Sequence, residues 1–264
     1  MKKKRNFQNS KTETVVYFIG SLVGLLLIWH LAVRFTALSK VMPLPGEVLS
    51  YMGQTFYQEI GSKILPLHIL YSLKRVFVGY LLACLIGIPV GILMGCSDTG
   101  KAIIKPVFEL LRPIPGLAWI PLAILWFGIG ESSKYFIICV SAIVSIILNT
   151  YSGASQVDPI LTGAAKMLGA KPLQIFFYIT LPASVPQIFA GLQVGLSSSW
   201  MAVIAAEMIR ASEGAGWIIT TGMESGNTVQ ILTGMISIGL VGLLLASLLR
   251  MLERRLCVWN IQGE

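Results

Sequence analysis

The sequence predicts an all-α, polytopic membrane protein with about six transmembrane helices. Of its 264 residues, 55% are hydrophobic and 12% are charged. A soluble domain of this size carries about twice that charged fraction. In addition, six apolar segments each approach the roughly 20 residues that a helix needs to cross a bilayer. Together these two observations indicate an integral membrane protein with one membrane domain.

The predicted spans follow one another along most of the chain. In order they are Val15–Val33, Val76–Gly95, Pro113–Ile129, Ser133–Thr150, Ile188–Met208 and Val229–Leu249. We interpret the first as an uncleaved helix, because its apolar run is longer than the roughly 7–15 residues of a cleavable signal peptide. The third is interrupted by Pro113, Pro115 and Pro121, with Arg112 at its entrance. Proline inside a membrane helix predicts a kink at that point.

The distribution of Lys and Arg predicts the orientation. With the N-terminus inside, 13 of the 20 basic residues fall in cytoplasmic stretches. An excess of Lys and Arg marks cytoplasmic loops. We therefore predict a basic cytoplasmic N-terminus at residues 1–14, a membrane domain at 15–255 and a cytoplasmic tail at 256–264. The net charge of +8 is explained by topology rather than by nucleic-acid binding, because the basic residues cluster beside apolar segments.

Three stripes of residues recur at every fourth position within the spans. Small residues in such stripes allow two helix backbones to approach closely in lipid. We interpret the first as packing between helices of one subunit, with a moving contact as the alternative. The stripes are Gly79, Ala83, Gly87, Gly91 and Gly95 on the second span, Ser141, Ser145 and Asn149 on the fourth, and Gly191, Gly195 and Ser199 on the fifth.

The longest polar gap, at about residues 151–187, predicts a structured loop of two short helices. Asp158-Pro159 is typical of a helix start, because Asp caps the first turn and Pro suits it. The helix should continue from Ile160 to Leu168 and stop at Gly169. A second short helix is predicted from about Pro172 to Ile179, ending at Leu181-Pro182. The orientation places this loop in the cytoplasm.

The loop resembles the cytoplasmic E-A-A-x3-G-x9-I-x-L-P motif of binding-protein-dependent ABC importer permeases. Gly163 stands where that family usually has Glu, and six residues match: Ala164, Ala165, Gly169, Ile179, Leu181 and Pro182. In that family, the loop fits a groove on an ATPase subunit and transmits its closure to the membrane helices. The departure at Gly163 leaves the first helical turn open to question, since Gly is a weak helix former.

The resemblance covers nearly the whole chain, and the matching segments look like those of permeases for nitrate, aliphatic sulfonates and taurine. It implies the MetI-like fold of type I importers, in a homodimer that works with two ATP-binding subunits and an extracytoplasmic substrate-binding protein in a bacterial cell membrane. The further segments that carry it are Leu44–Val48, Leu111–Pro115, Trp126–Glu131, Leu148–Thr150 and Ala206–Met208.

Several polar residues within the spans are candidates for the solute pathway. They are Asn149, Ser197, Ser198, Ser199 and Glu207. Ser hydroxyls in a helix also bond back to their own backbone, which is the alternative for the three serines. A carboxylate inside a membrane span is a functional candidate. Glu207 could instead pair with Arg210, three residues later on the same helix face.

No motif predicts catalysis, a cofactor or a metal site. The four cysteines have no metal or redox spacing, and no Gly-Lys-Ser/Thr follows the Gly-rich segment Glu213–Trp217. The chain should therefore neither bind nor hydrolyse ATP. We expect Glu213–Trp217 to lie outside and to dock the delivering protein. An ion-coupled secondary carrier is the alternative function, although such carriers need carboxylates or ion ligands near the midplane.

Overall fold

The computed structural model describes residues 11–257, except for the side chains of Lys11, Thr12, Thr14 and Arg210. The basic run Lys2–Arg5, Trp259 and nearly all of the predicted tail lie outside this part. The described chain is predominantly helical. Its long helices are α1 (Lys11–Phe35), α3 (Leu65–Cys96), α6 (Glu131–Ser155), α9 (Leu181–Arg210) and α11 (Thr228–Leu256).

The shorter elements connect these helices. They are the 3-10 helix η1 (Ala37–Lys40), α2 (Pro45–Gln54), β1 (Glu59–Ile60), β2 (Lys63–Ile64), α4 (Asp98–Leu111), the 3-10 helix η2 (Gly116–Trp119), α5 (Ile120–Phe127), α7 (Pro159–Met167), α8 (Pro172–Ile175), the π-helix η3 (Phe176–Thr180) and α10 (Ala215–Glu224). The strands β1 and β2 pair antiparallel as a small hairpin.

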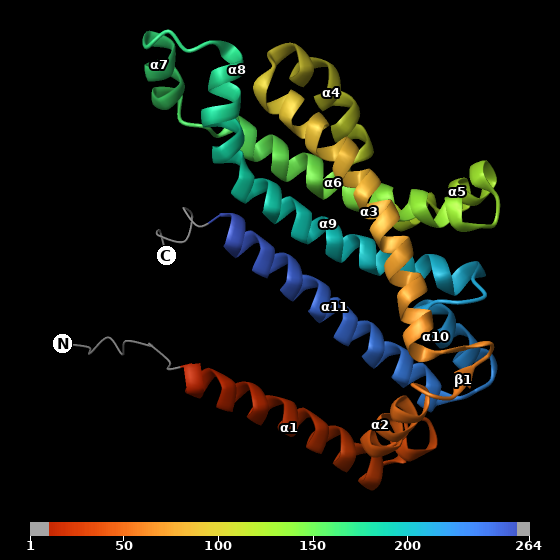
Figure 1. Cartoon of the computed structure of the whole chain (residues 1–264). Coiled ribbons are helices and arrows are strands. Elements are labelled where there is room, and N and C mark those ends of the chain that lie inside the picture. The colour runs from red at the N-terminus through yellow and green to blue at the C-terminus, as the bar shows by residue number, and fades with distance from the viewer. Residues whose placement is uncertain (1–10, 258–264) are drawn as a thin grey trace.

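The centre of the molecule is a row of packed long helices. The α6 helix packs between α3 and α9, and α11 lies beside α9 (Figure 1). The α1 helix stands apart and contacts the rest chiefly through η1 and α2. One end of the molecule carries α7 and α8, while the opposite end carries the hairpin, α2 and α10. The first residues of α1 and the last of α11 point to the side on which α7 and α8 lie.

Five helices are long and apolar enough to span a membrane, and a bent pair makes up to six. The kink predicted at the prolines of the third span is confirmed, but the predicted bounds are wrong, because the bent segment covers α4 and α5 rather than Pro113–Ile129. The structure has α4 before Pro113 and Pro115 and α5 after them, and the two parts meet at an angle of 83°. The reason is that Pro113 and Pro115 fall between the two helices and disrupt the helical hydrogen bonding there.

The second span begins much earlier than predicted. The α3 helix starts at Leu65, so that Arg75 lies inside the helix rather than at its entrance. Hydropathy alone placed the boundary at Val76, because Lys74 and Arg75 interrupt the apolar run. The bundle nevertheless buries Arg75 to 2% exposure. A charged residue at such a depth requires partners.

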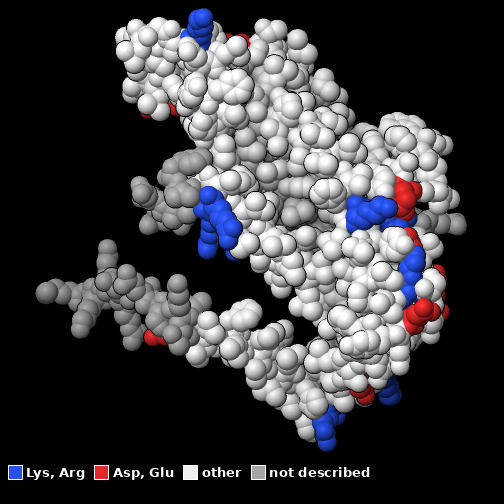
Figure 2. Space-filling model, viewed as in Figure 1, with Lys and Arg blue, Asp and Glu red and all other residues white. Residues whose placement is uncertain are grey.

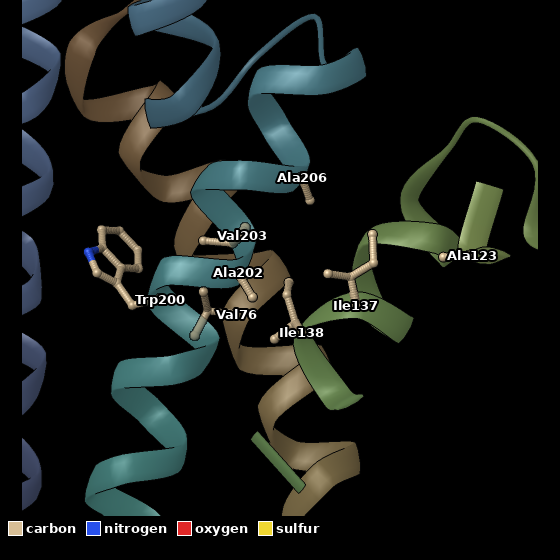
Figure 3. Packing of buried hydrophobic residues seen from close by; sticks show 8 residues of the cluster. All are labelled: Val76, Ala123, Ile137, Ile138, Trp200, Ala202, Val203 and Ala206. Atoms are coloured by element: carbon tan, nitrogen blue, oxygen red, sulfur yellow. The ribbon is translucent and has the colours of Figure 1, made fainter. Parts of the chain in front are cut away.

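The largest hydrophobic core cluster joins four helices near the hairpin end. Val76 of α3, Ala123 of α5 and Ile138 of α6 meet residues of α9 around Val203 (Figure 3). Trp200 belongs to the same cluster, and its indole N–H donates to the Ile238 carbonyl of α11 at 3.1 Å. The cluster therefore fixes the α3–α6–α9 unit and attaches α11 to it.

Charged side chains are concentrated towards the ends of the molecule. On the face shown in Figure 2, Lys, Arg, Asp and Glu form separate groups, and a broad uncharged area lies between them. Many large apolar side chains of the long helices are exposed, such as Leu85 at 63% and Leu243 at 68%. An uncharged band of this kind matches the hydrocarbon core of a bilayer.

Candidate functional site

The predicted cytoplasmic loop forms a projecting elbow, which we define as residues 158–180. The Asp158 carboxylate accepts a hydrogen bond from the Ile160 N–H at 2.8 Å and so caps α7. The helix ends before Gly169, whose φ of +81° lies in the left-handed region that favours glycine. The prediction of this helix and both its boundaries is confirmed to within one residue.

The elbow exposes apolar side chains at its tip. Met167 and Leu168 are 86% and 88% exposed, and Ile160 is 77% exposed. No residue of α7 is buried, and its packing is mainly against α8. The α7 helix therefore does not fold back onto the membrane bundle. Gly163 does not interrupt the helix, and a side chain there would meet open space.

Three residues of the motif meet in one groove of the elbow. Ala165 from α7, Gly169 from the turn and Ile179 from η3 help to line it. The groove has a volume of about 390 Å³, and the exposed ring of Tyr178 stands at its wall. Sequence spacing alone does not place residues 165 and 179 together. It is the reversal of the chain at Gly169 that does so.

The second half of the elbow differs from the prediction. Leu181-Pro182 does not end a helix, because α8 continues through η3 into α9. The Leu181 N–H bonds to the Phe176 carbonyl, five residues earlier, as in a π-helix. In a regular helix the Pro182 ring would clash with the carbonyl four residues before it. The wider π turn accommodates that ring without breaking the helix.

The opposite end contains a cluster of charged residues, which we call the ionic cluster. Arg75 donates two hydrogen bonds of 2.8 Å to the Glu131 carboxylate and one of 2.8 Å to Glu207. It also donates to the Glu213 backbone carbonyl at 2.9 Å. Two lysines complete the charge balance of three cations and three carboxylates. The members are Lys63, Arg75, Glu131, Lys134, Glu207 and Glu213.

Glu207 is the most enclosed carboxylate of the ionic cluster. Its side chain is fully buried, and its oxygens also accept hydrogen bonds from the Ser72 hydroxyl and the Gly216 N–H. The pairing with Arg75 joins α3 to α9, and Glu131 adds the start of α6. At the outer edge, the Glu213 carboxylate accepts a hydrogen bond from Lys63 and raises the pKa of that ammonium group. The ionic cluster thus ties three spans and the start of α10 together.

A histidine beside the ionic cluster holds the Gly-rich turn. His68 Nδ1 accepts a hydrogen bond from the Gly214 N–H at 3.1 Å. Its Nε2 lies 3.1 Å from the Ile60 carbonyl, which can only accept, so the proton of this neutral ring is on Nε2. Trp217 stacks on the ring at 5.0 Å between centroids.

The buried Glu207 has its ionic partner on another helix rather than on its own. Glu207 pairs with Arg75, and the side chain of Arg210 lies outside the described residues. On the exposed helix α4, Glu109 pairs with Lys105 at 3.7 Å. Sequence reasoning missed Arg75 as the partner because it considered neighbours on the same helix. The available signal was an Arg within a long apolar helix, which must find a carboxylate when buried.

The stripes of small residues serve contacts within the subunit. A Cβ added at Gly91 of α3 would lie 2.6 Å from the Thr150 side chain of α6. One added at Gly191 of α9 would lie 2.8 Å from Asn149 Cβ of α6. The interpretation of the first stripe as packing within one subunit is therefore confirmed. Helix α6 therefore packs closely against α3 on one side and against α9 on the other.

The candidate pathway residues occupy different environments. Ser199 is fully buried and its hydroxyl has no partner within the described chain. Ser197 is exposed and donates to the Gln193 carbonyl of its own helix, while Ser198 is half-buried. Asn149 donates to the Ser145 carbonyl at 2.8 Å. The structure does not bring these residues together with Glu207 at one site.

The side chains do not form a metal centre within residues 11–257. No group of three or more His, Cys, Asp or Glu is arranged there to hold a metal ion. The four cysteines are free thiols. The elbow and the ionic cluster therefore remain the two features with functional potential.

Comparison with known proteins identifies relatives over most of the chain. Residues 87–257 match the family model described as "Binding-protein-dependent transport system inner membrane component". The taurine transport system permease protein TauC of Escherichia coli is 35% identical over 93% of this chain and 90% of its own. The nitrate import permease protein NrtB of Synechocystis sp. is 36% identical over 88% of this chain and 86% of its own.

A solved structure has the same fold. A chain of the MetNI methionine ABC transporter superposes with a TM-score of 0.63 and covers 73% of this chain and 95% of its own. Its sequence identity is 20%, so the likeness concerns the fold. The predicted MetI-like permease fold is confirmed.

Proposed function

The chain belongs to the family of binding-protein-dependent transport inner-membrane components, and from this membership we propose its role in solute uptake. As an ABC transporter permease it is a non-catalytic membrane subunit, and ATP is hydrolysed on a separate subunit. We propose that two copies form the translocation pathway, that two ATP-binding subunits act on it, and that an extracytoplasmic binding protein delivers the solute.

The elbow carries this proposal, because its surface fits docking to another protein. Met167 and Leu168 expose apolar side chains at a tip that does not pack on the membrane bundle. The motif residues Ala165, Gly169 and Ile179 line the adjacent groove. We propose that an ATP-binding subunit covers this tip and the groove. Motion of the ATPase then reaches α9 directly, since α8 continues into that helix through η3.

We propose that the elbow and both chain termini are cytoplasmic. The start of α1, the end of α11 and the elbow lie on the same side of the molecule, which supports one compartment for all three. The excess of Lys and Arg in these stretches favours the cytoplasm. ATP is present in that compartment, so the orientation agrees with docking of an ATPase at the elbow.

The proposed cargo is a small anion such as an aliphatic sulfonate, taurine or nitrate. The support is the names of the two relatives, which transport taurine and nitrate. We keep Asn149, Ser197 and Ser198 as candidates for hydrogen bonding to the solute. For Ser199 and Glu207, burial inside the subunit favours a packing role. An ion-coupled carrier is disfavoured, because the buried Glu207 is already neutralised by Arg75.

The test combines assembly with uptake. The chain is expressed with its co-encoded ATP-binding subunit, and the double variant M167E/L168E is compared with G163E. We expect the double variant to lose co-purification and uptake of radiolabelled taurine or nitrate, because two charges would enter an apolar interface. The G163E variant should keep both, since position 163 faces open space and the motif that the loop resembles usually has Glu there.

Undiminished assembly of M167E/L168E with the ATP-binding subunit would contradict docking at the elbow.

The orientation is tested separately with K166C and a membrane-impermeant thiol reagent. We expect no labelling in intact cells and full labelling in inside-out vesicles. Labelling in intact cells would place the elbow outside and remove the basis of the proposal.

A further inference from the structure

The Gly-rich segment at residues 213–216, which leads from α9 into α10, is held by one face of α3. Residues about one turn apart share a helix face, and three side chains of α3 at this spacing bond to the backbone of the segment. We call this arrangement the turn clamp. Its bonds join His68 to the Gly214 N–H at 3.1 Å, Ser72 to the Ala215 N–H at 2.9 Å, and Arg75 to the Glu213 carbonyl at 2.9 Å.

The held segment also fits closely around a buried carboxylate of α9. The Gly216 N–H donates to Glu207 at 3.0 Å. Gly214 has a φ of +123°, in the region that favours glycine, and a Cβ added there would collide with the Glu207 carboxylate. The backbone of this segment is therefore fixed against both α3 and α9.

Helix α10 in turn positions the start of α11. The Gln230 side-chain amide of α11 donates to the Ile218 carbonyl at 3.0 Å and to the Thr221 hydroxyl at 2.9 Å. The two helices also pack closely, since a Cβ added at Gly222 would lie 2.9 Å from the Ile231 side chain. At this end of the molecule, the turn clamp thus connects α11 to the unit of α3, α6 and α9.

His68 is the member of the turn clamp whose hydrogen bonding changes with one proton. The ring is fully buried, and its Nε2–H is directed at the Ile60 carbonyl, so that the Gly214 N–H depends on the lone pair of Nδ1. A proton added at Nδ1 removes that lone pair and sets two N–H groups against each other. Histidine is also the side chain that ordinarily changes charge between about pH 5 and pH 8.

The charges around the ring are already balanced. Lys63 of the hairpin and Glu213 of the turn act on the ring from the elements packed against it, and they pair with each other. Glu207 of α9 pairs with Arg75. A protonated ring at this position would be a buried cation without a compensating carboxylate, which is costly. The proton is better accommodated after the turn has moved away from the ring.

We propose that the turn clamp is an acid-sensitive contact, which protonation of His68 at Nδ1 releases together with the start of α10. The released state takes up a proton that the clamped state excludes, so acid favours release. Release would detach α11 from α3 and α9 at this end. The exposure of this contact to external pH rests on the proposed function and its orientation, whereas the contact itself is tested without either.

The experiment follows Trp217, whose ring stacks on His68 at 5.0 Å between centroids. The full chain is labelled with fluorotryptophan in lipid nanodiscs, and fluorine NMR is recorded from about pH 8 to about pH 4, a range that includes the usual titration of histidine. The Trp217 signal is identified by its absence in W217F, and Trp200 of the core cluster is the internal control. Amide hydrogen exchange of residues 213–216, corrected for its intrinsic dependence on pH, measures release directly.

Two substitutions of His68 separate the proton from the hydrogen bond. In H68N, the amide oxygen can accept from the Gly214 N–H in place of Nδ1 but takes up no proton in this range. In H68Q, the amide reaches the position of Nε2 and leaves Gly214 without its acceptor. We expect H68N to remain clamped at every pH and H68Q to be released at every pH. In the wild type, the Trp217 signal should shift and amide protection should fall together on acidification.

S72A provides a test that leaves His68 in place. It removes one bond of the turn clamp, so release should need less acid, and the midpoint should rise by about 0.7 of a pH unit. A wild type without a transition, the same transition in H68N, or a Trp217 shift without loss of protection would overturn the proposal. If H68N does not fold, an unchanged midpoint in S72A would do so. These measurements do not involve uptake, so their failure is distinct from failure of the proposed function.

Discussion

The two ends of the molecule are built on opposite principles. The ionic cluster at one end buries charged groups and connects them across three spans. The elbow at the other end exposes apolar groups and packs on little but itself. The ionic cluster is stable only with all its partners, because removing one leaves a buried charge uncompensated. The elbow is incomplete without another protein, since exposed apolar side chains of this kind typically mark an interaction surface.

The comparison indicates how motion could pass between the two ends. The ionic cluster links helices α3, α6 and α9, and these helices are in close contact along the small-residue stripes. The elbow joins this unit at the end of α6 and through the π turn before α9. A displacement of the elbow is therefore expected to move α6 and α9 as one body. Packed interfaces shift between discrete arrangements rather than deform continuously.

Glu207→Leu gives the largest expected loss of stability. It leaves the Arg75 guanidinium buried with one carboxylate fewer and removes the acceptor for Ser72 and Gly216. Breaking a buried pair in this way costs about 3–5 kcal/mol. The measurement is unfolding of the purified chain in mixed detergent–SDS micelles.

The matched control for this change is Glu131→Gln. Its carboxylate is 46% exposed, and solvent compensates for much of the lost charge, so we expect a smaller loss of about 1 kcal/mol or less. If Glu207→Leu unfolds no more readily than Glu131→Gln, the buried pair does not stabilise the fold as proposed. The contrast between the ionic cluster and the elbow then does not hold.

Gly91→Val tests the connection between the two ends. The added Cβ would lie 2.6 Å from Thr150 Cβ and 2.9 Å from the Ile147 carbonyl, so α3 and α6 must separate. Overpacking of this kind costs about 1–3 kcal/mol. We expect a lower midpoint in the same unfolding assay.

Gly239→Val on α11 is the control for changing glycine to a branched residue. Its added atoms would meet open space, and stability should remain close to that of the wild type. Equal loss in both variants would show that the cost comes from the helix backbone rather than from the α3–α6 contact.

The elbow could be predicted from sequence because its determinants are local. Asp158 caps a helix that begins at the next residue, and Gly169 ends it, so that both signals lie within twelve residues. The π turn was missed for a different reason. Leu181-Pro182 normally predicts a helix end, and only the continuation into α9 shows how the chain accommodates the proline.

The ionic cluster could not be predicted in the same way because its partners are distant in sequence. Arg75 is 56 residues from Glu131 and 132 from Glu207. Helical spacing instead favoured Arg210, which is near Glu207 in the chain. Tertiary packing decides between such partners, because burial makes the pairing of Glu207 with Arg75 necessary. For the same reason the early start of α3 was missed.

A pair of glycine substitutions within the elbow is expected to have smaller and opposite effects. Gly169→Ala forces a side chain into the left-handed region at a φ of +81° and should destabilise the turn by about 1 kcal/mol. Gly163→Ala should stabilise α7 by up to about 1 kcal/mol, because Ala is the better helix former and space is available. Amide hydrogen exchange of residues 159–170 measures both. Protection that falls in Gly163→Ala would contradict the helical assignment there.

The smallest expected effect on stability belongs to Leu168→Glu. The side chain is 88% exposed and contributes little to folding of the isolated chain, so we expect a change within about 0.5 kcal/mol. Its effect on assembly should nevertheless be large, since the charge would be buried on docking. A lower unfolding midpoint for the isolated chain would mean that Leu168 supports the fold. In that case lost co-purification would no longer separate docking from folding, and the elbow would resemble the ionic cluster more than its exposure indicates.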